Sequence, residues 1–465
     1  MKRLSFLLLV ISFVSSTAMA VPVVFNDPNL KAAVEAKLGI TDPNATEMLL
    51  LTYLKVPSKG IFDLTGLQTA TNLVTLDVFD NNLTSISPLS GLPKLETLDI
   101  SDNNVSNIGY LAGVTTLTIF YAYGNNISAM DAVSILPNLF ELDLSDNHIV
   151  SYNAVANHPR LRYLNLSYNN SNDITPLVND VNLVSLGFGG NGLPNANMSI
   201  IAGFPKLEWL FLSDNLTISN LAPLAGLTHL QQLYLANNNI VDISPLAGLT
   251  NLVKLDLYGE LGNNISNLAP LAGLTNLTYL NLHFNNISDI SPLSGLTNLQ
   301  QLYLSYNANP PSNLGISDIS TLSNKHNLLD LRLASNNISD ISALAGLTQI
   351  EELRLGKNKI SNISYLTGYT HLTRLDLAKN PMNFASWCVY LKQIINANPS
   401  ANITSNPYID DRFTDMKDLL NFASEWLVKC DGDNSYCHGA DFERDGGHLN
   451  AEDFAIFANW WMWNK

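Results

Sequence analysis

The sequence contains little cysteine, little charge and few basic residues. Three cysteines among 465 residues are too few for a small scaffold held together by disulfides. Only 14% of the residues are charged but 46% are hydrophobic, so the chain can build a core and a disordered chain is excluded. Lys and Arg number 24 against 40 Asp and Glu, and they form no basic run. Because phosphate binding requires clustered cations, a nucleic-acid partner is excluded.

The sequence also has no apolar run as long as the ~20 residues of a membrane-spanning helix. Its first 20 residues have the features of a secretory signal peptide. Lys2 and Arg3 precede an apolar stretch of 11 residues that ends at Val14, and Ala18-Met19-Ala20 is a small-x-small cleavage site. We therefore expect an exported protein, secreted or at the cell surface, with no membrane span.

Sequence motifs of common enzyme classes are missing as well. The chain contains no G-x-S-x-G, no H-E-x-x-H, no phosphate-binding glycine loop and no dinucleotide fingerprint. Its eight histidines are scattered, mostly one to a repeat. We therefore expect no enzymatic activity.

What the sequence does contain is an internal repeat. From Leu73 onward the pattern L-x-x-L-x-L-x-x-N occurs 14 times, mostly at a spacing of 22 residues. The asparagines of the pattern are Asn81, Asn103, Asn125, Asn147, Asn169, Asn191, Asn215, Asn238, Asn263, Asn285, Asn307, Asn336, Asn358 and Asn380.

This spacing predicts the local structure of each unit. The two residues of Leu-x-Leu point to one face of a short strand, and the residue between them points to the other. The asparagine side chain can then bond the backbone groups that the following turn leaves unpaired. The second half of the unit, as in Ile243-Ser244-Pro245-Leu246, returns to the core through a turn or one helical turn. One unit cannot bury its leucines alone, so stacked units must form a continuous core.

These motifs resemble the leucine-rich repeats of the bacterial internalins, as in the segment from Asn285 to Leu299, NNISDISPLSGLTNL. The resemblance implies an α/β repeat solenoid, a horseshoe with parallel strands on the concave face and short helical turns on the convex face. It covers residues 66–383. The third unit departs from the pattern, because Phe120 and Ala122 replace its strand leucines.

Both ends of such a solenoid need caps, because a terminal repeat would otherwise expose its core. Residues 21–65 contain a helix that is predicted to start at Asp27-Pro28 and to stop at Gly39, which resembles a helical N-terminal cap. Residues 384–409 contain a second helical pattern, from Trp387 to Ala397, which we interpret as the C-terminal cap and a linker.

Aromatic residues are concentrated at the strand positions that are predicted to line the concave face. Such rings have no core to fill, so we interpret them as a surface that binds a protein or a glycan. The alternative is that tyrosine is common on exposed strands and packs on its neighbours there. The candidate residues are Phe79, Tyr121, Tyr123, Tyr163, Trp209, Phe211, Tyr234, Tyr258, Tyr279, His283 and Tyr303.

Charged residues occupy the same positions elsewhere in the repeats. Repeats twelve to fourteen carry arginines beside acids, which we interpret as ion pairs across repeats, with a ligand clamp as the alternative. Asp77, Asp99 and Asp143 form a column that we expect to be a solvated face. The arginines are Arg332, Arg354 and Arg374, and the acids are Asp330, Glu352 and Asp376.

The last part of the chain, residues 410–465, has no repeat of this kind and contains 12 acidic residues. A motif Phe-Ala-x-x-Trp occurs twice in it, from Phe422 and from Phe457, and predicts a pair of amphipathic helices. Just before the second helix, Asp441, Glu443, Asp445 and Glu452 stand at positions 1, 3, 5 and 12 of a possible Ca²⁺ loop. We predict one calcium site there, and the alternative is an acidic surface loop.

This arrangement resembles a degenerate dockerin, a small module of EF-hand type, which implies calcium-dependent docking onto a cohesin-like partner. Cys430 and Cys437 are expected to form a disulfide in an exported protein. The alternative is a zinc site formed by these cysteines with His438 and His448, although its spacing fits no common zinc pattern. Cys388 is expected to be a buried thiol in the C-terminal cap.

Taken together, the residues favour a secreted, non-enzymatic binding protein that recognises a protein or glycan through its concave face. A second hypothesis is a structural or accessory component of an extracellular, polysaccharide-related assembly. In that case the solenoid is mainly a spacer and the C-terminal module docks.

Overall fold

The structure is a computed structural model and describes residues 21–156, 158–308, 315–383 and 385–405. It consists of two compact units, Met1–Leu161 and Arg162–Lys465, called unit 1 and unit 2 below. The signal peptide over 1–20 lies outside the described residues. So do the dockerin-like helices, the calcium loop, the Cys430–Cys437 disulfide and the alternative zinc site.

Each repeat contributes one short strand whose middle residue is buried, as the Leu-x-Leu spacing predicts. Consecutive strands of a unit pair in parallel and in register, with Leu76 opposite Leu98 for example. In unit 1 the strands are β1 (Tyr53–Lys55), β2 (Thr75–Asp77), β3 (Thr97–Asp99), β4 (Ile119–Tyr121) and β5 (Glu141–Asp143). In unit 2 they are β6 (Tyr163–Asn165), β7 (Ser185–Gly187), β8 (Trp209–Phe211), β9 (Gln232–Tyr234), β10 (Lys254–Asp256), β11 (Tyr279–Asn281), β12 (Gln301–Tyr303), β13 (Asp330–Arg332), β14 (Glu352–Arg354), β15 (Arg374–Asp376) and β16 (Asn402–Thr404).

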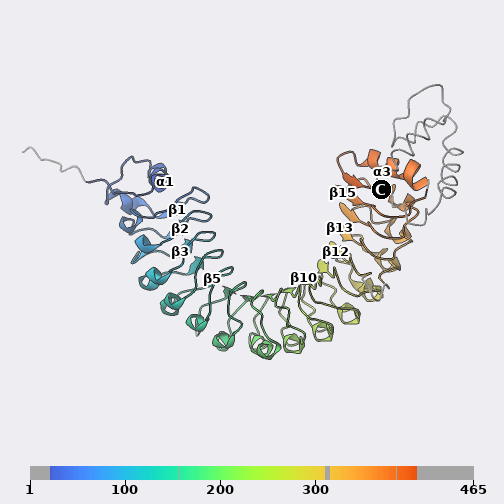
Figure 1. Cartoon of the computed structure of the whole chain (residues 1–465), viewed down its shortest axis with the longest axis horizontal. Helices are drawn as coiled ribbons and strands as arrows, with labels where there is room; N and C mark the ends of the chain where they lie inside the picture. Colours follow the sequence, from blue (N-terminus) through green and yellow to red (C-terminus); the bar gives the residue numbers. More distant parts are fainter. Residues whose placement is uncertain (1–20, 157, 309–314, 384, 406–465) are drawn as a thin grey trace, which may run out of the picture. The chain divides into compact units, whose positions relative to one another are not determined.

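The second half of most repeats forms a 3₁₀ turn on the side of the unit opposite its strands (Figure 1). Ser244–Leu246 is one of these turns, and Ile243 and Leu246 are both buried, so the predicted return to the core is confirmed. Further turns of this kind are Glu47–Leu50, Leu67–Thr69, Ser87–Leu89, Gly109–Gly113, Asp131–Ile135, Asn153–Val155, Thr175–Leu177, Asn195–Asn197, Ala222–Leu224, Ala269–Leu271, Ser291–Gly295, Ser320–Leu322, Ser342–Leu344 and Ser364–Leu366. One repeat adds a short α-helix, α2 (Met198–Ile201).

The predicted role of the repeat asparagine is confirmed. The Asn81 side-chain amide donates to the carbonyls of Val56 and Val78 at 3.0 and 2.9 Å. Its Oδ1 atom accepts the N–H groups of Lys59 and Ile61 at 3.0 and 2.9 Å. All fourteen asparagines of the pattern are buried. Within a unit, such an asparagine joins the turn of its repeat to the preceding repeat, as Asn81 does.

A second asparagine position also links repeats, and the sequence pattern alone did not indicate it. In the T-N-L segment, Asn276 donates from its side-chain amide to the Thr250 carbonyl at 2.9 Å. Asn298 bonds Thr275 in the same way, also at 2.9 Å. These amides are exposed, unlike those of the buried series.

The third repeat keeps the fold despite its unusual strand. Phe120 and Ala122 are fully buried, and β4 pairs with β3 and β5 in register. The larger ring at one position and the smaller side chain two residues later therefore still fill the core.

Two strands extend the sheets beyond the fourteen repeats identified in the sequence. Before them, β1 keeps the apolar spacing with Leu51, Leu54 and Val56, but Lys59 stands where the asparagine would be. After them, β16 pairs with β15, with Ile403 opposite Leu375. No leucine-rich spacing marks β16 in the sequence.

The predicted N-terminal cap is confirmed. Helix α1 spans Pro28–Leu38, begins at the N-cap Asp27 and ends at Gly39, whose φ of 67° glycine adopts without strain. The second carboxylate oxygen of the buried Asp27 accepts the Phe62 N–H at 2.6 Å. One carboxylate therefore caps the helix and anchors it to the repeats.

The predicted C-terminal helix is present, with a wider first turn. A π-helical turn over Ser386–Tyr390 leads into α3, which spans Leu391–Ala397 and buries Leu391 and Ile394. Asn398 then donates its side-chain amide to the Tyr369 carbonyl at 2.8 Å, which ties the cap to the preceding repeat.

Candidate functional site

The predicted recognition residues lie on the exposed side of the strands and are half-buried. Phe79, Tyr121 and Tyr123 belong to unit 1, and the other eight belong to unit 2.

In unit 1 the rings stand among acidic side chains. The Phe79 and Tyr123 ring centroids lie 6.1 Å apart. The aspartates of this column are half-buried rather than solvated, which corrects the sequence-based expectation. Asp99 accepts the Ser101 N–H at 2.9 Å, and burial together with the neighbouring Asp77 charge raises the pKa of the Asp99 carboxyl. Each of these aspartates bonds the backbone N–H two residues ahead, and this local bond explains why the column is not free in solvent.

In unit 2 the rings contact one another from strand to strand. Phe211 and Tyr234 stack with their centroids 4.8 Å apart and their planes 12° apart. Tyr163 of β6 and Trp209 of β8 lie 5.9 Å apart in a tilted arrangement, and they meet across Ser185 of the intervening strand β7. Neighbouring strands bring equivalent positions of successive repeats together, so side chains 23 to 25 residues apart in sequence become contacts.

Two rings of this group were missed by the sequence analysis, Phe284 and Tyr306. They precede the repeat asparagine, and their rings stack with centroids 4.2 Å apart and planes 5° apart. Tyr258 contacts the edge of this pair, 5.4 Å from Phe284. Together these residues form what we call the aromatic strip: Trp209, Phe211, Tyr234, Tyr258, Tyr279, His283, Phe284, Tyr303 and Tyr306.

The backbone at the missed position could have provided the signal. The residue before the asparagine has a positive φ in most repeats, and Asp, Asn or Gly often occupies it, as at Asp80 and Gly124. Phe284 and Tyr306 adopt φ values of 55° and 61° there. A bulky residue in this conformation costs roughly 1–2 kcal/mol. Contacts outside the core, such as the stacking of these two rings, offset this cost.

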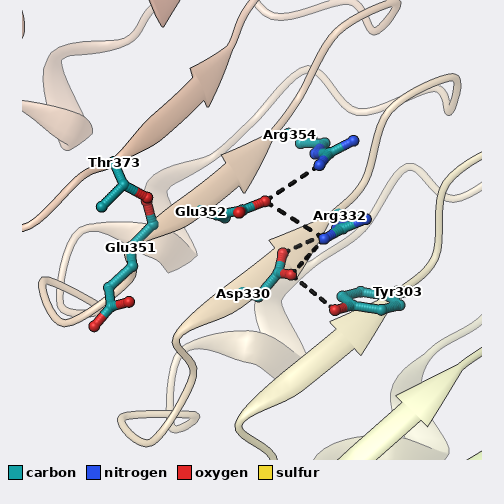
Figure 2. A network of polar contacts seen from close by, with 7 residues as sticks. All are labelled: Tyr303, Asp330, Arg332, Glu351, Glu352, Arg354 and Thr373. Atoms are coloured by element: carbon teal, nitrogen blue, oxygen red, sulfur yellow. Dashed lines mark hydrogen bonds and ion pairs between the residues drawn. The ribbon is translucent and has the colours of Figure 1, made fainter. Parts of the chain in front are cut away.

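Tyr303 is the most constrained ring of the strip. Its hydroxyl donates to Asp330 Oδ2 at 2.8 Å, and the Arg332 guanidinium lies 4.3 Å from its ring centroid (Figure 2). His283 stacks on the ring with centroids 5.3 Å apart. Tyr279 meets it edge-on at 5.5 Å. These contacts hold the ring in place before any ligand arrives.

Next to Tyr303, the strands β13 and β14 carry a network of ion pairs (Figure 2). Arg332 pairs with Asp330 of its own strand at 2.7 Å and with Glu352 of the next strand at 3.4 Å. Arg354 pairs with the same Glu352 at 3.2 Å. The predicted ion pair across repeats is confirmed for Arg332, whereas Arg354 pairs with an acid of its own strand. Arg374 forms none within the described part of the chain.

Burial keeps Tyr258, His283 and Tyr303 of the strip in their neutral forms near neutral pH. Burial raises the pKa of Tyr258 and of Tyr303 to about 12, and the bonds to Glu260 and Asp330 add to this. Burial, together with the Arg332 charge, lowers the pKa of His283 to about 4, and its Nδ1 atom accepts the Ser305 N–H at 2.7 Å. Burial also raises the pKa of Asp256. The strip therefore presents neutral, amphipathic side chains.

Comparisons with known proteins agree with this geometry. The sequence profile described as "Leucine Rich repeats (2 copies)" matches residues 71–113, 205–248, 228–273, 275–324 and 326–368. The matched residues are therefore leucine-rich repeats, and both units contain them. It resembles an internalin of Listeria monocytogenes, with 27% identity over 82% of this chain and 97% of that one and a TM-score of 0.53. No curated protein sequence matches the chain.

Two further solved structures share the leucine-rich repeat fold. A leucine-rich repeat protein of Leptospira interrogans is 20% identical over 77% of this chain and 97% of that one, with a TM-score of 0.64. The leucine-rich repeat ectodomain of the plant membrane receptor kinase GASSHO1/SCHENGEN3 of Arabidopsis thaliana was solved in complex with Casparian strip integrity factor 2. It is 20% identical over 71% of this chain and 44% of that one, with a TM-score of 0.52.

Within the described ranges, no three His, Cys, Asp or Glu side chains come together in a way that could hold a metal ion. The helices that the structure describes are all too short or too polar to cross a membrane.

Proposed function

We propose that the protein is an exported, non-enzymatic binding protein, and that the aromatic strip of unit 2 recognises a polypeptide. Half-buried tyrosine and tryptophan rings beside arginine are the side chains that dominate the energetics of protein–protein interfaces. The observation that carries the proposal is the strand-to-strand packing of these rings on an exposed sheet face.

The orientation of the rings favours a polypeptide over a glycan. A sugar binds best to a free ring face, but several faces in the strip are covered by neighbouring side chains. Phe211 stacks on Tyr234, and Phe284 stacks on Tyr306. Tyr303 has His283 stacked on it and the Arg332 guanidinium over its ring. Ring edges then remain for a ligand, and they suit peptide groups and apolar side chains.

The test is capture of partners from the secreted and envelope fractions of the source organism with matched variants. Tyr234→Ala and Tyr258→Ala each remove a ring of the strip. Tyr365→Ala is the control, because Tyr365 is 37% exposed on a 3₁₀ turn of the same unit, away from the strands. Loss of a binding hot spot costs about 2 kcal/mol or more, so each strip variant should recover roughly 30-fold less partner. The control should recover an unchanged amount.

Treatment of the fractions before capture separates the two ligand classes. Protease treatment should abolish capture, and glycosidase treatment should leave it intact. Capture that survives the Tyr234→Ala and Tyr258→Ala variants would contradict a role for the strip. Capture lost only after glycosidase treatment would contradict the polypeptide.

The spacer hypothesis and the predicted calcium-dependent docking depend on residues 410–465. These residues lie outside the described part of the chain, so the dockerin-like module, its Ca²⁺ site and its cohesin-like partner stay predictions.

A further inference from the structure

We propose that four cationic side chains next to the aromatic strip bind an acidic segment of the same polypeptide. They are Arg354, Lys357, Arg374 and Lys379, here called the cationic patch. The proposal rests on the proposed function, since the segment belongs to the partner that the strip recognises.

The patch is an exception in an acidic protein of net charge −16. Arg354 and Arg374 lie on the neighbouring strands β14 and β15, with their side chains on the exposed side. Lys357 and Lys379 follow at equivalent positions, with φ values of 53° and 59°, and the Lys357 N–H donates to the Ala378 carbonyl beside Lys379. Adjacent repeats lie about 4.8 Å apart, so the like charges of Lys357 and Lys379 stand side by side at a cost to stability.

The acids of this face are engaged elsewhere. Glu352 faces Arg374 in the strand register, but its carboxylate bonds Arg332 and Arg354. Asp376 faces Arg354, but its Oδ1 atom accepts the Ala378 N–H at 3.0 Å. Its carboxylate also lies over Gly356, within 3.0 Å of where a Cβ would stand, so a side chain at 356 would displace it. Figure 2 shows the Glu351 carboxylate pointing away from both arginines of the network.

In the described structure, the side chains of the cationic patch therefore have N–H donors that are not used. Among the described residues, Lys357, Lys379 and Arg374 form no ion pair. Arg354 has five N–H donors. One bond, from Nη2 to Glu352, is made, and its Nε is buried without an acceptor in the described structure. Carboxylates of a ligand would satisfy these groups.

The patch adjoins the strip directly. The Lys357 ammonium lies 5.8 Å from the Tyr306 ring centroid, and Arg332, which shares Glu352 with Arg354, covers Tyr303. A single extended segment that contacts the rings would reach the cations with its next residues. The acidic side chains of more distant repeats repel the acidic segment only weakly, because salt screens charges over about 8 Å.

The test is the binding of fluorescein-labelled decaglutamate to the full chain, measured by fluorescence anisotropy. Decaglutamate should bind more tightly than decalysine and should weaken as salt is raised. Lys379→Glu and Arg374→Glu should each weaken binding at least fivefold. The matched control is Lys254→Glu, an exposed lysine on the same side of β10 in unit 2, which should change binding less than twofold.

Three outcomes would overturn the proposal. They are no binding of decaglutamate, equal losses in Lys379→Glu and Lys254→Glu, or tighter binding of dextran sulfate than of decaglutamate. Decaglutamate has no aromatic or apolar side chain, so Tyr234→Ala should bind it normally while losing the captured partner. Failure of the patch and failure of the strip are therefore distinguishable.

Discussion

Replacing the buried Asn285 by alanine should destabilise unit 2 much more than the same change at the exposed Asn276. The Asn285 amide donates to the carbonyls of Leu257, Leu282 and His283 at 2.9, 3.3 and 3.1 Å. Its Oδ1 atom accepts the Ile265 N–H at 3.0 Å. Asn285→Ala removes all four bonds at once.

The loss of stability follows from the hydrogen bonds that each backbone group still makes in the variant. The Leu257 and Leu282 carbonyls still accept from Asn263 and Asn307, and the His283 carbonyl still accepts the Gly259 N–H. The Ile265 N–H loses its partner inside the core. An orphaned buried donor costs about 1–3 kcal/mol, and weakening the carbonyls adds roughly 0.5–1 kcal/mol. We expect about 2–3 kcal/mol for Asn285→Ala.

Asn276 provides the matched control. Its amide makes one bond, to the exposed Thr250 carbonyl, and water can replace it. Asn276→Ala should therefore cost about 0.5 kcal/mol. Urea unfolding measures both, and hydrogen exchange at the Ile265 amide adds a local measure, because repeat arrays can lose two-state behaviour. Equal losses of stability in the two variants, or unchanged protection of Ile265, would refute the reasoning.

Two further predictions concern buried charges. Burial raises the pKa of Asp256, so its ionised form opposes folding above that pKa. Asp256→Asn should therefore raise the melting temperature at pH 7, and the gain should vanish below about pH 4, where both states are protonated. Asn165 and Asn281 make the same bond to the backbone in other repeats, so a lower melting temperature at pH 7 would contradict this. Burial lowers the pKa of Lys325, which is fully buried where other repeats have leucine, as at Leu296 and Leu347. Lys325→Met should stabilise the protein by about 1 kcal/mol at pH 7 in urea unfolding, with less gain near pH 11 as the lysine loses its charge. A Met variant less stable than wild type at pH 7 would show that the Lys325 bonds to Ser294 and Asn324 outweigh its burial.

The local spacing of residues determined most of the repeat. Leu76 and Val78 are buried and Asp77 is half-buried, as a two-residue period requires. Asn81 bonds the turn as predicted, and Asp27 and Gly39 bound the helix that the pattern indicated. The burial of the strand residues and the bonds of the asparagine involve residues of the same repeat or the equivalent residues of the next one. The sequence of one repeat is therefore enough to predict them.

Contacts between different side chains of successive repeats were decided only by the tertiary structure. The left-handed backbone before the asparagine turns Phe284 and Tyr306 toward the strip, and the pattern assigned these positions no role. The register places Glu352 opposite Arg374, but the Glu352 carboxylate bonds Arg332 and Arg354 instead. Ring stacking and ion pairing depend on which side chains meet across strands and on their rotamers. A repeat period specifies the positions, but only packing in three dimensions selects the partners.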